Sequence, residues 1–140
     1  MIDAVIARLE SSVTLLKMTG GAAQFQNAAE TNPKVTPAAF VIPLGEDPSA
    51  SAMGDLVIQR VTATIGVILV VRNVSDVKGE AARQDMDALR KAVKDILLGW
   101  QPTSEYDPLA RGRSNLLLFK DMHMWWQDIY TTSYIDRSIL

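Results

Sequence analysis

One stretch of the chain decides the fold: residues 56–73 read Leu-Val-Ile-Gln-Arg-Val-Thr-Ala-Thr-Ile-Gly-Val-Ile-Leu-Val-Val-Arg-Asn. Apolar residues recur at every second position, in a set made up of Val61, Ala63, Ile65, Val67, Leu69 and Val71. The positions between them are polar at first, as at Arg60, and become apolar at Ile68 and Val70. Successive side chains of a strand point to opposite faces of the sheet, so this pattern predicts a long strand. One face is buried throughout, and the other changes from solvated to buried midway.

The next segment, residues 76–98, changes from the period of a strand to that of a helix. Asp76 suits the N-cap position, and Glu80 places a negative charge where the helix dipole favours it. One side of this helix carries an apolar stripe, formed by Ala82, Met86, Leu89, Val93, Ile96 and Leu97. Gly99 and Pro102 end the helix. A long strand followed by a long amphipathic helix is therefore expected to form the central unit of the domain.

The N-terminal third predicts a second helix and two weaker strands. The helical stripe consists of Ile2, Val5, Ile6, Leu9, Val13 and Leu16, and the Gly20-Gly21 pair follows it. Residues 22–29 are a poor strand candidate, and residues 37–44 form a short apolar strand. Pro43 cannot donate to a ladder, so this strand is expected to stop there or to lie at a sheet edge. Residues 45–54 are rich in glycine, serine and proline, and we expect a mobile loop.

The C-terminal third predicts further strands. Residues 103–114 are polar and are interpreted as a loop or a short irregular strand. Residues 116–126 form a strand whose one face carries Leu116, Leu118, Met122, Met124 and Trp126, and residues 127–134 form a last strand or its continuation. Together the segments predict a single α+β domain over residues 1–140, with a mainly antiparallel sheet and two principal helices packed on one face.

Composition excludes several classes of function. The 140 residues carry a net charge of −2, so neither a nucleic-acid footprint nor a membrane-surface patch is indicated. There is no cysteine, which excludes disulfides and thiolate metal sites. Charged residues such as Asp3 and Arg8 interrupt the first apolar segment, so no signal peptide is expected. The longest apolar run, residues 67–71, is far shorter than the roughly 20 residues that span a bilayer. We expect a soluble protein.

The chemistry-bearing residues do not form a recognisable catalytic set. His123 is the only histidine, so one chain cannot complete a histidine metal site. A base made of His123 and Asp121 is conceivable, although a structural role near the tryptophans fits this histidine better. No phosphate-binding glycine loop occurs, and the Gly112-Arg-Ser sequence lacks the second glycine of a nucleophile elbow. We therefore expect no enzyme, no catalytic or metal-binding residues and no cofactor.

Two pairs of carboxylates and one aromatic cluster are the remaining candidates for a catalytic or binding site. Glu46 and Asp47 are interpreted as solvated loop residues, while Asp85 and Asp87 point to adjacent faces of a helix and cannot share a proton. The cluster of Met122, Met124, Trp125 and Trp126 is interpreted as core or subunit interface, with a ligand pocket as the alternative.

Four motifs in this order carry a family resemblance: Pro37-Ala-Ala-Phe-Val-Ile-Pro-Leu-Gly45, Gly66-Val-Ile-Leu-Val-Val-Arg-Asn73, Leu97-Leu-Gly-Trp-Gln-Pro102 and Trp126-Gln-Asp-Ile-Tyr-Thr-Thr132. The chain resembles the tail terminator, or tail completion, proteins of long-tailed bacteriophages and prophages. The resemblance implies a small α+β protein that forms a ring, usually a hexamer, on the head-proximal end of the tail tube. Such a ring stops tube growth and offers a surface to the head-completion and connector proteins.

The resemblance also implies where the protein acts and what it contacts. Its partners are other copies of itself, the tail tube protein and the head-completion proteins, while DNA passes through without specific binding and no membrane is involved. It belongs to the virion tail and is assembled in the bacterial host cytoplasm. Ring closure needs two different patches on each subunit. Arg111 and Arg113 are expected to meet Glu46 or Asp47 of a neighbour, because arginine binds carboxylates bidentately.

Two other readings remain open at this stage. One is a small non-enzymatic adaptor domain that binds a protein partner through the Trp125 and Trp126 surface. The other is a small hydrolase or isomerase built around His123 and Asp121.

Overall fold

The computed structural model describes residues 1–51, 54–73, 75 and 79–139. In this part of the chain, helices and strands follow one another in the order α1 (Ile2–Ser12), β1 (Met18–Gly20), α2 (Ala22–Thr31), β2 (Ala38–Pro48), β3 (Ile58–Arg72), α3 (Glu80–Leu97), β4 (Ala110–Lys120) and β5 (His123–Arg137). The strands form one sheet in the order β1-β2-β3-β5-β4. Only β1 is parallel to its neighbour; all the other pairs are antiparallel. The predicted α+β class is confirmed.

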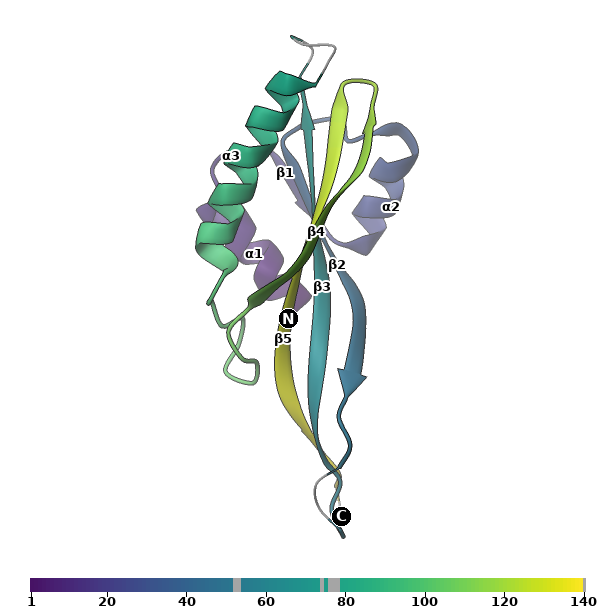
Figure 1. Ribbon diagram of the computed structural model, residues 1–140, viewed down its shortest axis with the longest axis vertical. Coiled ribbons are helices and arrows are strands. Elements are labelled where there is room, and N and C mark those ends of the chain that lie inside the picture. The colour runs from purple at the N-terminus through teal and green to yellow at the C-terminus, as the bar shows by residue number, and fades with distance from the viewer. Residues whose placement is uncertain (52–53, 74, 76–78, 140) are drawn as a thin grey trace.

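The long central strand β3 organises both cores, as its sequence pattern indicates. Its odd-numbered side chains from Ile65 to Val71 pack with α1 and α3, which lie on one side of the sheet (Figure 1), and Val61 and Ala63 are buried on the same face of the strand. Ile68 and Val70 face the opposite side, where they pack with Phe40 and Trp125 beneath α2. The predicted change from a solvated to a buried second face is confirmed, because α2 covers only the half of β3 that contains these residues.

The predicted strand at residues 22–29 is wrong, because this segment belongs to helix α2. Alanine favours helices more than any other residue, and the segment contains four alanines in ten residues. The side chain of Gln24 also accepts a hydrogen bond from the Gly21 N–H at 3.0 Å, which satisfies a free donor at the helix start. Helix α2 therefore covers the face of the sheet opposite α1 and α3.

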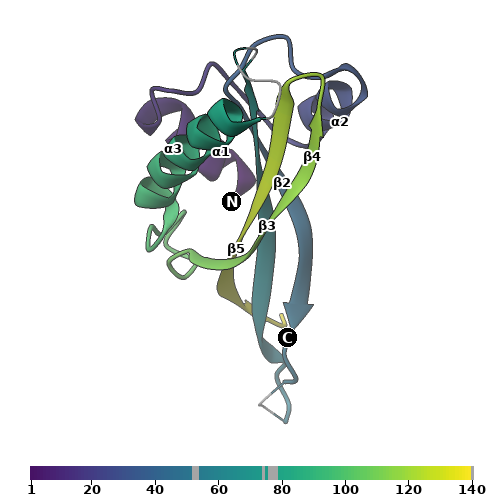
Figure 2. The same cartoon turned by 45° about the horizontal axis from the view of Figure 1, so that its top comes forward.

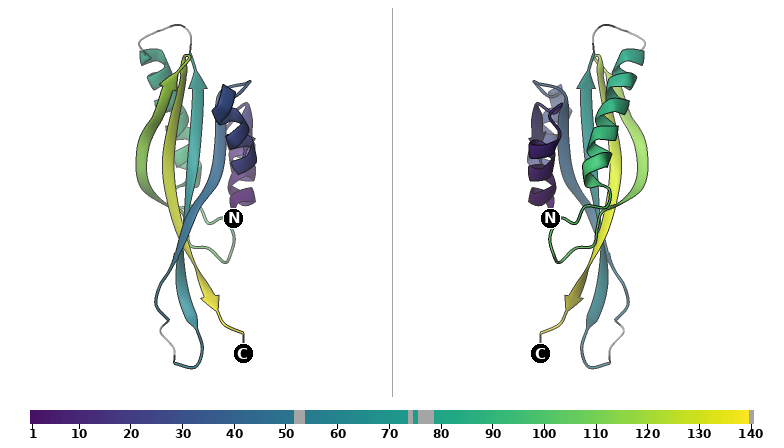
Figure 3. Two further views of the ribbon diagram at one scale, coloured as in Figure 1. Left: turned by 90° about the vertical axis from the view of Figure 1, so that its right-hand side faces the viewer. Right: turned by 90° about the vertical axis from the view of Figure 1, so that its left-hand side faces the viewer.

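Strand β2 is longer than predicted. It continues past Pro43 through a bulge before Gly45 and ends at Pro48, so the first four residues of the predicted loop at residues 45–54 are strand. Of the rest, residues 52–53 lie outside the described part of the chain. Strand β1 pairs with β2 only at Ala38–Phe40, so β2 is an edge from Val41 onward, as Pro43 indicates. Residues 45–48, 58–64 and 131–137 form an arm that extends beyond the helices (Figure 3).

The strand predicted at residues 116–126 is in fact parts of two strands. Asp121 and Met122 form a tight turn in which both residues have positive φ, 54° and 62°, the conformation of a two-residue hairpin loop. Glycine or asparagine usually marks such a turn, and neither is present here. Strand β4 also begins at Ala110, within the predicted loop. A bulge between Leu116 and Leu118 places these two side chains on opposite faces. The hairpin lies at the end of the molecule opposite the arm (Figure 2).

Helix α3 confirms the predicted stripe. Ala82, Met86, Leu89, Val93 and Leu97 are buried on it. The helix begins at Glu80, and the left-handed Gly79, with φ of 84°, precedes it. The predicted cap Asp76 lies outside the described residues.

Candidate functional site

A buried carboxylate joins α3 to the sheet. In β5, even-numbered residues face α1 and α3, because they pair with the odd-numbered residues of β3. Asp128 occupies one of these inward positions, opposite Val67, and its side chain is only 3% exposed. Arg90 reaches it from α3, and Ser114 reaches it from β4. An unpaired charge at such a depth is strongly unfavourable, so its partners decide its role.

Three side chains donate hydrogen bonds to the Asp128 carboxylate. Arg90 donates through Nη2 to Oδ1 at 2.9 Å and through Nε to Oδ2 at 3.0 Å. The Ser114 hydroxyl donates at 2.6 Å and the Trp126 indole at 3.2 Å. Burial raises the pKa of Asp128, but the hydrogen bonds from Arg90, Ser114 and Trp126 outweigh it and hold the pKa below its usual value. The group is therefore ionised, and its donors come from α3, β4 and β5.

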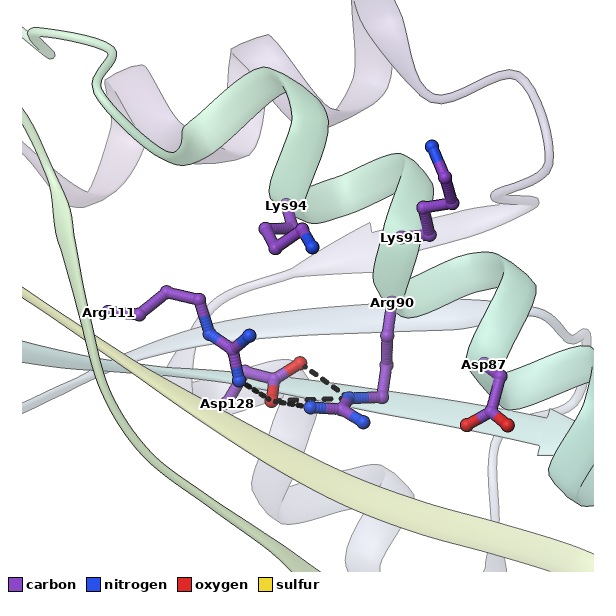
Figure 4. A pocket seen from close by; sticks show the side chains of 6 residues that line it. All are labelled: Asp87, Arg90, Lys91, Lys94, Arg111 and Asp128. Carbon is purple, nitrogen blue, oxygen red and sulfur yellow. Dashed lines mark hydrogen bonds and ion pairs between the residues drawn. The ribbon is translucent and has the colours of Figure 1, made fainter.

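A shallow pocket of about 230 Å³ opens above this carboxylate (Figure 4). Four cationic and two acidic side chains line it: Arg90, Lys91, Lys94, Arg111, Asp87 and Asp128. The guanidinium groups of Arg90 and Arg111 both point toward Asp128, and Arg111 donates to Ser114 Oγ at 2.6 Å while lying 3.7 Å from Asp128. Positive charge exceeds negative charge in the lining, so the pocket suits a carboxylate or another anionic group.

Trp126 and Tyr130 flank Asp128 on the same face of β5. The Arg90 guanidinium lies over the Trp126 ring, 4.4 Å from its centroid. Tyr130 is completely buried, and burial raises the pKa of its hydroxyl to about 12. Within the described residues this hydroxyl has no hydrogen-bond partner. The site is rigidly packed around the carboxylate, which is typical of a structural ion pair.

The four residues predicted at a subunit interface lie on two separate strands. Arg111 and Arg113 are near the start of β4, at one edge of the sheet. Glu46 and Asp47 are on β2 in the arm, with β3 and β5 between the two strands. Glu46 accepts a hydrogen bond from the Tyr134 hydroxyl at 2.6 Å, which raises the pKa of that tyrosine to about 12. Arg111 is partly committed to Ser114 and Asp128, whereas Arg113 is exposed.

The structure places His123 and Asp121 side by side but not as an acid–base pair. His123 is 7% exposed, and its Nδ1 lies 2.8 Å from the backbone oxygen of Asp121. The exposed Asp121 side chain belongs to the tight turn, so the imidazole contacts the main chain of that residue and not its carboxylate. Over the described ranges, no three His, Asp or Glu side chains are grouped to hold a metal ion. Nor is any described helix long and apolar enough to span a bilayer.

The aromatic cluster is divided between the two cores. Trp125 is 4% exposed, packs with Phe25 and Phe40, and donates to Asn32 Oδ1 at 3.1 Å. Trp126 lies on the other face under Arg90. Met124 and Trp125 are buried and Trp126 is partly buried, so these three belong to the cores as predicted, whereas Met122 lies in the tight turn and is only partly buried. The adaptor reading assumed an open surface of both tryptophans, and this does not form because Trp125 is buried. Sequence reasoning missed the contact between Arg90 and Asp128. The one feature of the sequence that points to it is that Asp128 lies between Trp126 and Tyr130 on the otherwise apolar face of β5.

Comparison with known proteins identifies the family. A model of the phage tail terminator protein family matches residues 2–139, almost the whole chain. The chain belongs to the phage tail terminator family. Tail terminator proteins are structural components of phage tails, and the family is not a class of enzymes.

A solved structure shares the tail terminator fold seen here. A chain from the "Virion of native gene transfer agent (GTA) particle" superposes with a TM-score of 0.59. The comparison covers 97% of this chain and 95% of the other, at 14% sequence identity. No curated protein sequence matches this tail terminator.

Proposed function

We propose that this protein closes into a ring, a hexamer, on the head-proximal end of a phage tail tube. The ring stops growth of the tube and offers a surface for the proteins that join the head. The observation that carries the proposal is the family match over residues 2–139. The fold shared with a chain of a gene transfer agent virion supports it, because that chain also works within a particle.

The shape of the subunit suits a ring component. The arm and the β4–β5 hairpin project at opposite ends of the molecule, and a ring between a tube and a head must contact a partner on each side (Figure 2). The site around Asp128 locks α3 onto the sheet, which keeps the body rigid between these ends. A net charge of −2 supplies no strongly basic surface, consistent with DNA that passes without specific binding. On this proposal the protein needs no cofactor and no membrane, and it is assembled in the bacterial host cytoplasm before it becomes part of the virion tail.

Ring closure requires a head-to-tail contact between two different surfaces of neighbouring subunits. We assign this contact to Arg111 and Arg113 of one subunit and to Glu46 and Asp47 of the next. The two sets have opposite charge and lie on separate strands, so they cannot satisfy each other within one subunit. The cationic pocket beside Arg111 enlarges the surface that attracts an acidic segment.

Electron microscopy of tails assembled with and without the protein tests the proposal. With the protein, tubes should have a uniform length, carry a ring at one end and join heads. Without it, tubes should grow to variable lengths and remain without heads. Tubes of normal length that join heads in its absence would refute the proposed function.

A charge reversal tests the assigned contact. Arg113→Glu is better suited than a change at Arg111, because Arg111 also supports the buried Asp128 cluster. Arg113→Glu should reduce the fraction of protein found in rings while leaving the melting curve unchanged. Arg83→Glu, at an exposed position on α3, is the matched control and should assemble normally. Equal assembly of the two variants would remove Arg113 from the contact.

A further inference from the structure

Two edges of the sheet carry unpaired main-chain groups. At one side β4 has no neighbour beyond β5. At the other side β1 covers β2 only at Ala38–Phe40, so residues 41–48 of β2 are free along their outer side. Free edges attract further strands, and proteins control what can pair with them. The two edges here differ in hydrogen-bonding capacity, in charge and in the apolar side chains they present.

The β2 edge is poor in donors. The Lys17 N–H donates to Pro37 O on the β1 side, and the Ser49 N–H donates to Arg60 O on the β3 side, both at 2.8 Å. Main-chain groups alternate in direction along a strand, and the bulge before Gly45 shifts that alternation by one residue. Pro43 and Pro48 therefore both face outward, where neither can donate a hydrogen bond. Two copies of this edge cannot pair well with each other, because both lack the same donors.

The β4 edge has the complementary properties. No proline interrupts Ala110–Lys120, so every residue of the strand retains its N–H. Its charged residues are all basic, namely Arg111, Arg113 and Lys120, whereas those of β2 are the acidic Glu46 and Asp47. Like charges oppose pairing of β4 with β4, and opposite charges favour pairing of β4 with β2.

Exposed leucines beside β4 complete the surface. Leu116, Leu117 and Leu118 are each 42–49% exposed. Leu117 and Leu118 line an apolar pocket of about 170 Å³ together with Phe25, Ala29 and Trp125, on the face of the sheet that carries α2. On β2, Leu44 is 43% exposed and extends over Gly66 on this same face, since a Cβ built on that glycine would lie 3.3 Å from the leucine.

We propose that in the ring β4 of each subunit lies antiparallel along residues 41–48 of β2 of the next subunit. The partner subunit's Leu44 then fills the pocket beside Leu117 and Leu118. This inference rests on the proposed ring and names its strand contact. The direction follows from residue order, because β4 runs from arginines to leucines while β2 runs from apolar to acidic residues. Only an antiparallel arrangement brings both the charged and the apolar residues together.

The register follows from the side of the sheet on which the charges lie. Glu46 pairs with Ala63 and Arg111 with Tyr130, so both face α1 and α3. Placing the partner subunit's Glu46 beside Ser114 puts it within reach of Arg111, which already bonds that serine. The same register places the partner subunit's Leu44 beside Leu117, which lies on the pocket face, whereas Leu116 lies on the face of Trp126. One strand pairing thus satisfies charge on one face and apolar contact on the other.

Disulfide trapping tests this contact, and the chain contains no cysteine that would interfere. Opposed residues of antiparallel strands have Cα atoms about 4.5–5.5 Å apart, within the range that a disulfide bridges. The variant Leu44→Cys/Leu117→Cys, whose two positions share the pocket face, should, after assembly and oxidation, give a covalent ladder up to the full ring on a non-reducing gel. The control Leu44→Cys/Leu98→Cys has equal exposure, since Leu98 is 50% exposed, and should give none. If the first variant does not fold, Asp47→Cys/Arg113→Cys occupies the same register.

The outcomes separate this inference from the proposed function. Rings of the unmodified chain without a ladder in either test variant overturn the strand contact and leave the ring intact. Efficient dimers of the single variant Leu117→Cys would mean that β4 pairs with β4, which also overturns the proposed strand contact. A ladder of equal strength in the control variant Leu44→Cys/Leu98→Cys would also overturn the strand contact. Absence of rings from the unmodified chain with tail tubes present overturns the proposed function as well.

Discussion

The buried ion pair between Arg90 and Asp128 allows a quantitative prediction, because the chain also contains an exposed pair of equal length. Arg90 Nη2 lies 2.9 Å from Asp128 Oδ1, and Lys91 Nζ lies 2.9 Å from Asp95 Oδ2. The first two side chains are 23% and 3% exposed, and the second two are 73% and 54% exposed. The two pairs differ in burial and in their donors, because Asp128 also accepts hydrogen bonds from Ser114 and Trp126. Changing each aspartate to asparagine therefore compares a buried, multiply bonded carboxylate with an exposed one.

We expect Asp128→Asn to lower the free energy of unfolding by about 3 kcal/mol. Breaking one partner of a buried ion pair typically costs about 3–5 kcal/mol, because the remaining charge is left without compensation. The lower end applies here, since Arg90 is 23% exposed and regains some hydration. For a domain of this size the loss corresponds to a decrease in Tm of about 10 °C. Asp95→Asn should leave the melting curve unchanged, as for most exposed pairs.

Urea melts followed by circular dichroism measure both variants at neutral pH. The wild-type advantage over Asp128→Asn should also depend on pH. The folded state holds the pKa of Asp128 below its usual 3.8, so the unfolded state binds the proton more readily. The stabilisation is therefore complete above about pH 4 and is lost as the pH falls through the folded-state pKa. A loss in Asp128→Asn no larger than that in Asp95→Asn would refute the argument that burial makes this pair important.

Three further variants test the core, the histidine and the arm. Leu69→Ala should lower the free energy of unfolding by about 2–5 kcal/mol in denaturant melts, because Leu69 is fully buried. The control Leu98→Ala changes an exposed residue and should stay within about 0.5 kcal/mol of wild type. Similar losses in the two variants would mean that the β3 faces are inverted. His123→Ala should lower stability but leave tail completion intact, and a folded variant inactive in completion would revive the catalytic reading. Tyr134 should titrate near pH 12 in NMR of labelled tyrosine, and Glu46→Gln should lower this pKa because it weakens the acceptor of the Tyr134 hydroxyl. The stabilisation from the hydrogen bond between Tyr134 and Glu46 is present below about pH 10 and is lost as the pH rises through 12. An unchanged titration in the variant would exclude the hydrogen bond in solution.

Residue periodicity alone was sufficient for the central strand and the long helix of this protein. The alternation from Val61 to Val71 and the stripe from Ala82 to Leu97 identified β3, α3 and their buried faces. Both patterns are long, and when a whole face of an element is buried, apolar residues recur along the sequence at the period of that element. The family was also accessible from sequence, because its motifs occur in a constant order along the chain.

Short elements and pairings depended on tertiary contacts. Residues 22–29 gave an ambiguous pattern, and packing of Phe25 and Ala28 against the second face of the sheet accompanies the helix there. The Asp121–Met122 turn carries no glycine or asparagine, so local chemistry did not mark it. At the turn local preference was weak, and the pairing of β4 with β5 decided the conformation.

The site around Asp128 could not be derived from sequence because its parts come from distant segments. Arg90 and Asp128 are 38 residues apart, and their contact depends on the crossing of α3 over β5. Sequence did suggest Glu46, Asp47, Arg111 and Arg113 as residues of a subunit interface. The fold then placed them on separate strands, with β2 and β4 each leaving an edge free. Strand order is a property of the whole sheet, because it is determined by how all five strands share one pair of cores.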